Sequence, residues 1–548
     1  MRWWWSLCVV VAAVGLASGA GGAEGSAGYL LPGDLAPSHY DLKYTFDLDP
    51  KTNFSYYGVV DILLKVKQNT AKIVLHAQDF TVAEDKITID GDADVPRVQG
   101  VKLNDTYNFL TLTLDKELVE GQNYTLTIPF HGNLTQGLDG VYISSYVNKK
   151  TKNKEYLVTT QFEAISARKG FPCFDEPVYK ATFRLTIGHH KDYSAVSNMP
   201  LATSTVDNAL EKYWSWPVIA ESFKKDRSDF VWDQFENSVP MSTYLVAFVV
   251  STFSHVTSPP ELSGTTFRIW ARSDAIDQTS YAATVGPKVL SHFEKFFNVS
   301  FPLPKQDMFA IPDFSAGAME NWGLITYRET ALLYDKDQSS FTNKERVAEV
   351  IAHELAHQWF GNLVTMRWWS DLWLNEGFAT YAASVGVAAV EPTWHAERLY
   401  AVDNILSVLT LDALESSHPL PNKVLVRQRG ARRPVGGADG RSERARRAGA
   451  RRQREDRHGH VDHADRIPAA HCHQGVRGQD AHHQSETVPV PGRARPQRRL
   501  LVGAAERAVR GGGPRAAAGG RAVAGRQRGR GGPAPVRTRR GHRSVGAV

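Results

Sequence analysis

The pattern of hydrophobic and polar positions divides the chain into regions with different periods. From about Tyr29 to His255, short runs such as Tyr40–Tyr44 alternate apolar and polar residues, and Gly, Asp and Asn separate them. A period of two is typical of half-buried strands. Because no helical pattern intervenes, we predict an N-terminal β-rich domain of antiparallel saddle or sandwich sheets over residues 29–255.

Helical periodicity begins at Tyr281, in a first segment that ends near Phe297. A second helix is predicted from Thr342, which is spaced from Glu345 as in a capping box, to about Gly361.

Two further helices are predicted, one from Ser370 toward Pro392 and one from about Trp394 to Leu414. Residues 256–421 are therefore expected to form a mainly helical domain. The predicted fold class is α+β, with several domains.

The composition changes abruptly after Pro421. No Phe, Tyr or Trp follows Tyr400, Lys423 is the last lysine, and residues 422–548 carry 30 Lys plus Arg against 9 Asp plus Glu. The formal net charge of +6 therefore combines an acidic body with a basic tail. Two interpretations stay open: a disordered basic arm that binds anionic polymers, or GC-rich coding sequence translated out of frame. The His clusters at 458–463 and 471–473 resemble metal ligands in composition, but under the second interpretation this resemblance is accidental.

The N-terminus has the layout of a secretory leader. An apolar run from Trp3 to Leu16 follows Arg2, and small residues occupy positions 17–20. We expect residues 1–20 to be a cleaved signal peptide, with an uncleaved anchor as the alternative, because the run is shorter than the roughly 20 residues that span a bilayer. Five glycosylation sequons agree with export to the cell surface or exterior: Asn53, Asn104, Asn123, Asn133 and Asn298.

The three cysteines do not indicate a disulfide framework. Cys8 lies in the leader and Cys472 in the tail, which leaves Cys173 alone in the body. A lone cysteine between Pro172 and Phe174 is interpreted as a small buried apolar residue rather than a nucleophile.

The strongest chemical motif is His353-Glu354-Leu355-Ala356-His357, inside the second predicted helix. Residues four apart project from one helix face, so both imidazoles can bind one tetrahedral zinc ion while Glu354 lies beside its open position. The alternative is a pair of surface histidines on an amphipathic helix.

A catalytic zinc ion has three protein ligands and an open fourth position. Glu376 follows His357 by 19 positions, in an apolar and aromatic run that is expected to be buried. A buried carboxylate requires a cation, so Glu376 is the predicted third ligand of a single Zn²⁺ per chain. Glu354 is then the predicted general base for peptide hydrolysis. It takes a proton from the attacking water and passes that proton to the leaving amine.

Four further motifs, with the zinc residues, give the chain a resemblance over about residues 30–421 to the aminopeptidase N family of gluzincin zinc aminopeptidases. They are Gly317–Asn321, Thr160–Ala164, Phe171–Pro177 and Asp412–Pro419. The resemblance implies that residues 256–421 form a thermolysin-like catalytic domain that is incomplete at its end.

The resemblance implies that Glu320 and Glu163 bind the free α-amine of a peptide. It also implies that the Gly317, Ala318 and Met319 backbone holds the peptide like an added strand, next to Asn321, and that Gln161 lines the first side-chain pocket. Two carboxylates at the closed end of the binding site attract the ammonium group of the substrate's N-terminus. The scissile bond then lies one residue away from that group.

The family also has a tyrosine that stabilises the oxyanion, a small β domain and a large helical domain, where this chain has its Arg-rich tail. The predicted function is zinc-dependent removal of N-terminal residues from peptides with a free N-terminus, with turnover of this chain in doubt because one lost oxyanion donor costs about 10²–10³ in rate.

Three alternatives stay open: a thermolysin-like endopeptidase, a catalytically impaired surface receptor, and a tail that binds anionic polymers. Nucleic acid is not an expected partner, while membrane association of the parent protein and a homodimer are both left open.

Overall fold

The computed structural model describes residues 29–48, 54–92, 95–210 and 229–417. The predicted signal peptide, Asn53 and the tail at 422–548 lie outside these described residues.

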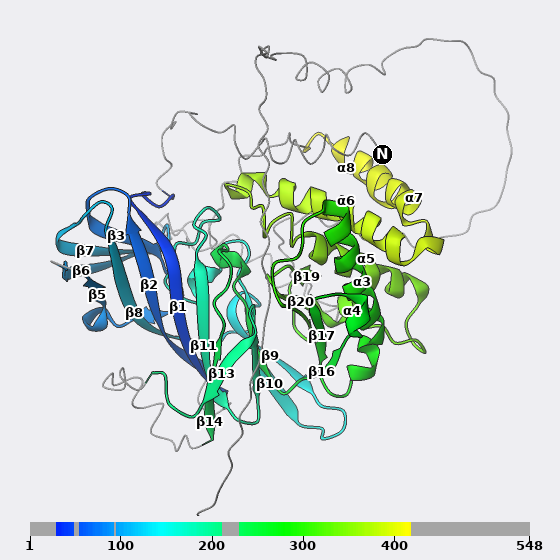
Figure 1. The fold of residues 1–548 in the computed structure, drawn as a ribbon, viewed down its shortest axis with the longest axis horizontal. Coiled ribbons are helices and arrows are strands. Elements are labelled where there is room, and N and C mark those ends of the chain that lie inside the picture. Colours follow the sequence, from blue (N-terminus) through cyan, green and yellow to red (C-terminus); the bar gives the residue numbers. More distant parts are fainter. Residues whose placement is uncertain (1–28, 49–53, 93–94, 211–228, 418–548) are drawn as a thin grey trace, which may run out of the picture. The chain divides into compact units, whose positions relative to one another are not determined.

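The first half of the described chain is built of β-sheets, drawn in colours from blue through cyan to green in Figure 1. The largest sheet has the strand order β13-β14-β11-β1-β2-β8-β4, with β5 also paired to β8. Its strands are β1 (Leu35–Asp47), β2 (Ser55–Val66), β4 (Thr81–Val82), β5 (Thr88–Gly91), β8 (Asn123–Asn133), β11 (Thr182–His190), β13 (Leu201–Thr205) and β14 (Phe230–Phe235).

Two smaller sheets complete the N-terminal region, in the orders β3-β7-β6 and β12-β15-β10-β9. Their strands are β3 (Thr70–His76), β6 (Val98–Asn104), β7 (Phe109–Leu118), β9 (Gly140–Val147), β10 (Lys154–Gln161), β12 (Ser194–Ser197) and β15 (Phe248–Ser251). The predicted β-rich domain with antiparallel sheets is confirmed. One pair departs from the antiparallel expectation, because β1 and β11, far apart in sequence, run parallel.

The second half of the described chain contains a five-stranded sheet that the prediction of a mainly helical domain omitted. Its order is β16-β17-β18-β20-β19, and β17, β18 and β20 run parallel. The strands are β16 (Ser254–Thr257), β17 (Thr266–Ala271), β18 (Lys305–Ile311), β19 (Ala318–Met319) and β20 (Leu324–Arg328). All seven residues of β18 are buried, so this strand shows continuous burial instead of the alternation that signals a strand in sequence.

Helices pack beside this sheet, as the green and yellow ribbons of Figure 1 show. They are α3 (Ser280–Phe297), α4 (Glu329–Leu332), α5 (Phe341–Ala356), α6 (Trp373–Val390), α7 (Ala396–Tyr400) and α8 (Ser407–Asp412). The first predicted helix matches α3 closely, and α5 packs against both α3 and α6.

The boundaries of α5 correct the prediction. The N-cap is Ser340, whose hydroxyl accepts from the Asn343 amide while the Asn343 side chain accepts from the Ser340 amide. This reciprocal pair replaces the predicted Thr342–Glu345 box, because an Asn at the third helical position closes the cap as a Glu would. The regular helix ends at Ala356, so His357 is the C-cap with helical dihedral angles rather than an interior residue.

The last predicted helix, Trp394–Leu414, is interrupted. A 3₁₀ turn at Pro392–Trp394 precedes α7, and a π-helical stretch at Ala401–Leu406 separates α7 from α8. None of the residues of α7, this stretch or α8 is buried, so tertiary packing does not enforce one regular helix here.

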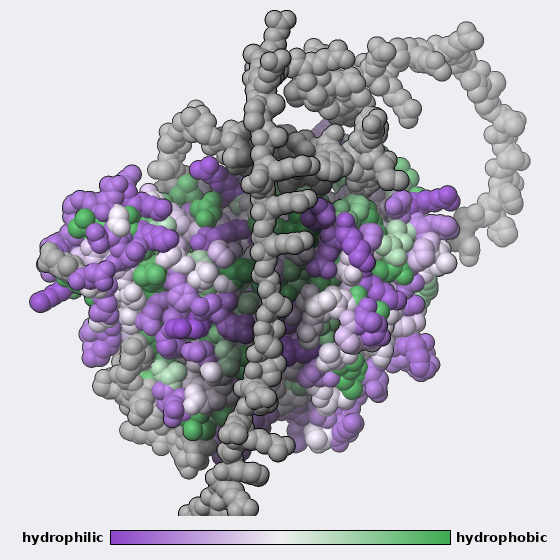
Figure 2. Space-filling view, viewed as in Figure 1, coloured by the Kyte–Doolittle hydropathy of each residue, from purple (hydrophilic) through white to green (hydrophobic). Residues whose placement is uncertain are grey.

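The surface and the core agree with the sequence patterns. The visible face of the described residues is mostly hydrophilic, with hydrophobic side chains scattered among polar ones (Figure 2). The four described sequon asparagines at 104, 123, 133 and 298 are exposed, and Cys173 is buried as a free thiol, which confirms the apolar interpretation of that residue. Among the described residues, no helix has the length and apolar character needed to cross a membrane.

Candidate metal centre

Close packing of α6 brings Glu376 to the two histidines at the end of α5. The buried face of α6 carries small residues, among them Ala379, Ala383 and Gly386. A Cβ on Gly386 would lie 3.3 Å from the Cβ of Ala352 on α5 and 2.8 Å from the ring of Phe293 on α3, so glycine permits the close approach of α6 to both helices. The small residues therefore set the distance between the two helices that carry the candidate ligands.

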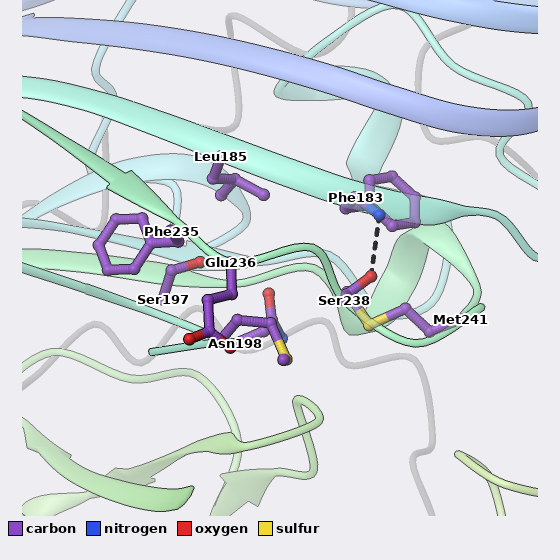
Figure 3. A pocket seen from close by; sticks show the side chains of 9 residues that line it. Phe183, Leu185, Ser197, Asn198, Phe235, Glu236, Ser238 and Met241 are labelled. Atoms are coloured by element: carbon purple, nitrogen blue, oxygen red, sulfur yellow. Dashed lines mark hydrogen bonds between the residues drawn. The ribbon is translucent and has the colours of Figure 1, made fainter. Parts of the chain in front are cut away.

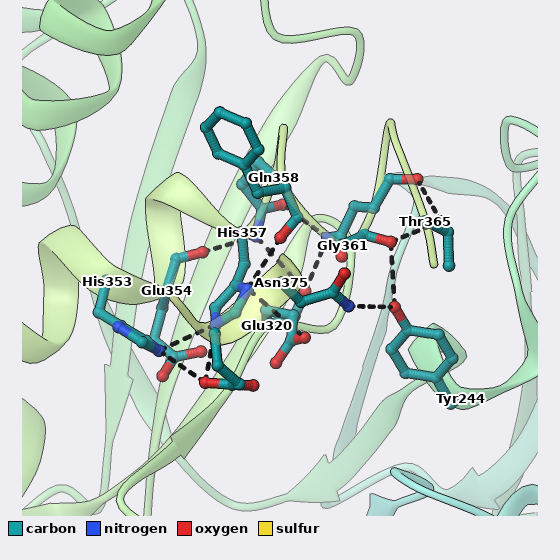
Figure 4. Close-up of polar contacts among 12 residues, drawn as sticks. Tyr244, Glu320, His353, Glu354, His357, Gln358, Gly361, Thr365 and Asn375 are labelled. Atoms are coloured by element: carbon teal, nitrogen blue, oxygen red, sulfur yellow. Dashed lines mark hydrogen bonds and ion pairs between the residues drawn. The ribbon is translucent and has the colours of Figure 1, made fainter. Parts of the chain in front are cut away.

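The three predicted ligands converge. Nε2 of His353 and Nε2 of His357 lie 2.9 Å apart, and Oε2 of Glu376 is 3.3 Å from the first and 3.7 Å from the second. Figure 4 shows both imidazoles turned toward one point beside α5. Together they form a group with the composition and spacing to hold a metal ion.

The protonation of His357 suits a metal ligand. Its Nδ1 lies 2.9 Å from the carbonyl oxygen of Phe360, and since a carbonyl can only accept, Nδ1 carries the proton. The lone pair of Nε2 is then directed at His353 and Glu376. A backbone partner of this kind commonly orients a metal-binding histidine. Two imidazoles and a carboxylate are also a donor set that zinc accepts, so these residues fit the ion.

The charges of His357 and of the carboxylates beside it shift one another's pKa values. Burial alone would lower the pKa of His357, but the carboxylates of Glu320 and Glu376 raise it well above its ordinary value. Burial alone would raise the pKa of Glu376, yet the imidazoles of His357 and His353 lower it below its ordinary value. The pocket therefore strongly favours positive charge.

Glu354 is buried, and its Oε2 has no hydrogen-bond partner. Burial raises the pKa of Glu354 well above the ordinary value, although His357 opposes the shift. A carboxylate with a raised pKa and a free oxygen is suited to accept and return a proton.

Glu320 and Glu163 are brought to the same pocket from separate elements. Glu320 follows β19 and Glu163 follows β10, and their carboxylates lie with that of Glu376 in a second group whose oxygens are within 4.8 Å of one another. Oε1 of Glu320 and Oε1 of Glu163 are both buried, and neither has a hydrogen-bond partner among the residues that the structure describes. Burial raises the pKa of each carboxyl group, and in Glu163 the charges of Glu320 and Glu376 add to that effect.

The segment Gly317–Asn321 lies at one edge of the five-stranded sheet. Ala318 and Met319 of β19 pair only with Tyr327 and Thr326 of β20, and β19 is the last strand of its sheet. Asn321 is buried and donates from Nδ2 to the Thr326 hydroxyl at 3.1 Å. Gln161, the last residue of β10, is buried with an unpartnered Oε1 two positions before Glu163.

Several contacts at the site were not predicted. Asn362 donates from Nδ2 to the Glu320 carbonyl at 2.9 Å, and Gln358 donates to the Glu354 carbonyl at 2.9 Å. Tyr244 donates its hydroxyl to the Gly361 carbonyl at 3.0 Å, as Figure 4 shows. Thr380 contacts His353, and its position four residues after Glu376 on one helix face is a sequence signal that could have identified it.

The small pocket in Figure 3 lies elsewhere. Its lining includes Phe183, Asn198, Phe235 and Met241, and it contains none of the predicted site residues. Asn198 nevertheless connects this pocket to the segment after Glu320, because its Nδ2 donates to the Trp322 carbonyl at 2.9 Å.

Comparisons with known proteins agree with this geometry. Residues 36–245 match the Peptidase M1 N-terminal domain, and residues 281–429 match the Peptidase family M1 domain. The chain is 41% identical over 403 residues to aminopeptidase N of Bos taurus, which covers 72% of the chain and 40% of that relative. It is 40% identical over 402 residues to aminopeptidase N of Homo sapiens, with 72% and 40% covered. Aminopeptidase A of Gloydius brevicauda is 41% identical over 394 residues, with 72% and 38% covered. The chain thus spans about 40% of the length of the curated relatives it matches.

Proposed function

Since this chain belongs to peptidase family M1, we propose that it is a zinc aminopeptidase, of the aminopeptidase N type, that hydrolyses the N-terminal bond of peptides. His353, His357 and Glu376 hold one Zn²⁺ in this proposal. When bound, zinc supplies Lewis-acid chemistry, in that it lowers the pKa of a water molecule to about 7 and polarises the scissile carbonyl.

Glu354 moves the proton. It lies one residue after His353, on the same turn, and its buried Oε2 has no partner. In the proposed reaction this oxygen takes a proton from the attacking water and returns it to the leaving amine.

The observation that carries the assignment to an aminopeptidase is the pair of unpartnered oxygens on Glu320 and Glu163 beside the histidines. Buried carboxylate oxygens without hydrogen-bond donors are costly, and a substrate ammonium would supply positive charge and the missing hydrogen bonds. The free edge of β19 supports binding of the peptide backbone as an added strand. Gln161 and Asn321 are proposed to line the same end of the site.

A pair of substrates tests this function. We expect the zinc-loaded chain to hydrolyse a peptide with a free N-terminus and to leave the N-acetylated form of that peptide intact, with Glu320→Gln raising KM for the free form. Equal hydrolysis of both forms would instead indicate an endopeptidase.

We also propose that the protein enters the secretory pathway and acts at the cell surface or outside the cell. The leader-like run at Trp3–Leu16 and the exposure of the described sequon asparagines support this location. Removal of one or more glycans by a glycosidase, seen as a mobility shift of the protein from expressing cells, tests it. Membrane attachment and a homodimer remain predictions, as does the out-of-frame interpretation of residues 422–548.

A further inference from the structure

The pocket beside the proposed zinc site contains more carboxyl groups than one zinc ion would neutralise if all of them were ionised. Glu163, Glu320, Glu354 and Glu376 all act on one another electrostatically. Four ionised carboxylates around one divalent cation would leave an excess of two negative charges, and Glu320 and Glu354 are buried. Uncompensated buried charge is unfavourable, so the pocket requires further positive charge or bound protons.

Three of these carboxylates form a second ligand group. One oxygen each from Glu163, Glu320 and Glu376 lies within 4.8 Å of the others. Because a carboxylate has two oxygens, Glu376 can serve the histidine group with one and this group with the other. A bridging carboxylate between ions about 3.5–4 Å apart is a common arrangement of two-metal sites.

An independent observation indicates that this pocket receives a ligand. The Glu320 side chain is 3% exposed, and its Oε1 has no hydrogen-bond partner in the described structure. Its nearest basic group is Nδ1 of His357 at 3.8 Å, but that nitrogen donates to Phe360 instead. A buried carboxylate oxygen without a donor is an open coordination position.

We propose that Glu163, Glu320 and Glu376 bind a divalent cation in addition to the zinc ion, in the pocket where the α-amine of the substrate binds. The ligands are all oxygens, so the pocket suits a hard cation such as Mn²⁺, whereas the two imidazoles next to it suit zinc. The cation and the substrate amine then compete for Glu320 and Glu163, and the second cation inhibits the peptidase. This inference rests on the proposed function, because it shares Glu376 and the amine pocket with it.

The test is a titration of the full, zinc-loaded chain with Mn²⁺, followed by the loss of the free-ion electron paramagnetic resonance signal. We expect one Mn²⁺ per zinc-loaded chain. Since partners that only orient a ligand already contribute 10- to 100-fold in affinity, loss of a direct ligand in Glu320→Gln or Glu163→Gln should weaken Mn²⁺ binding at least about tenfold. Glu261→Gln, which changes an exposed carboxylate outside the site, should bind Mn²⁺ like the wild type.

A competition on the wild-type chain needs no variant to fold. Alaninamide, which has a free α-amine, should raise the apparent Kd for Mn²⁺, and N-acetylalaninamide should not. Equal Mn²⁺ binding by all variants, no Mn²⁺ binding by zinc-loaded protein, or no competition by alaninamide would each overturn the inference. If the chain retains zinc but binds no Mn²⁺, only the second cation site is refuted and the proposed function stands. If the chain retains no zinc, both the proposed function and the second cation site are refuted.

Discussion

The hydroxyl of Thr380 lies 3.4 Å from Nδ1 of His353, so a residue of α6 supports a proposed zinc ligand on α5 from the side opposite the metal. Thr380→Val keeps the shape of the side chain and removes this contact. Because such partners orient the imidazole, zinc affinity should fall by about tenfold. Competition with a chromogenic chelator measures the change, and Thr380→Ser, which retains the hydroxyl, should restore wild-type affinity. Unchanged affinity in Thr380→Val would show that the contact does not orient His353.

Glu354→Gln separates proton transfer from metal binding. The amide has nearly the shape of the buried carboxyl, and it cannot accept the proton of the attacking water. Hydrolysis of a free-amine peptide should fall by about 10²–10⁴ while the zinc content stays at the wild-type level. Hydrolysis near the wild-type rate would exclude Glu354 as the base.

Glu176 predicts a pH dependence of stability. Burial raises the pKa of this carboxyl group to about 7, although the Leu31 amide donates to it at 2.7 Å. The folded state therefore holds a proton that the unfolded state has released between about pH 4.5 and pH 7, so this group destabilises the fold as the pH rises through that interval. Glu176→Gln should reduce the loss of unfolding free energy over this pH interval by about 2 kcal/mol.

Urea denaturation at pH 5 and pH 7.5 measures the effect. The difference in unfolding free energy between the two pH values should be smaller in Glu176→Gln than in the wild type, whereas Glu261→Gln, at an exposed carboxylate, should match the wild type. The same pH dependence in all three proteins would contradict the assigned shift.

Gly323 is the last residue of the short segment between β19 and β20 that also contains Glu320. Its φ is +82°, and a Cβ there would lie 2.4 Å from the Asn198 carbonyl oxygen. Gly323→Ala should therefore lower the unfolding free energy by about 2 kcal/mol or more, because it combines left-handed strain with a backbone clash. Gly264→Ala, where no atom lies within 4 Å of the added Cβ, is the matched control in thermal denaturation. Equal stability of the two variants would show that the segment can shift without cost.

The sequence predicted that the candidate ligands His353, His357 and Glu376 lie close together, but it misplaced the bounds of the helix that carries the histidines. His353 and His357 could be placed on one face because a helix brings residues four apart together, whatever the exact cap. The cap itself was assigned to Thr342 instead of Ser340, since Asn343 is a less common closing residue than Glu.

Other features depend on tertiary packing and could not be read from a local pattern. The buried strand β18 has no alternation, so the five-stranded sheet was missed. The Asn362 contact to the Glu320 carbonyl joins residues 42 positions apart, and no spacing rule predicts it. Glu163 and Glu320 were assigned from the family resemblance, and their convergence with Glu376 became visible only in three dimensions.

The zinc content of the purified full chain tests whether His353, His357 and Glu376 bind a zinc ion. The wild type and His395→Asn, which replaces an exposed histidine whose φ of +55° asparagine tolerates, should each retain one zinc ion after dialysis against metal-free buffer. His353→Ala should retain less than about a tenth as much, because it removes one of three protein ligands. Equal zinc content in wild type and His353→Ala, or no zinc in the wild type, would contradict the account.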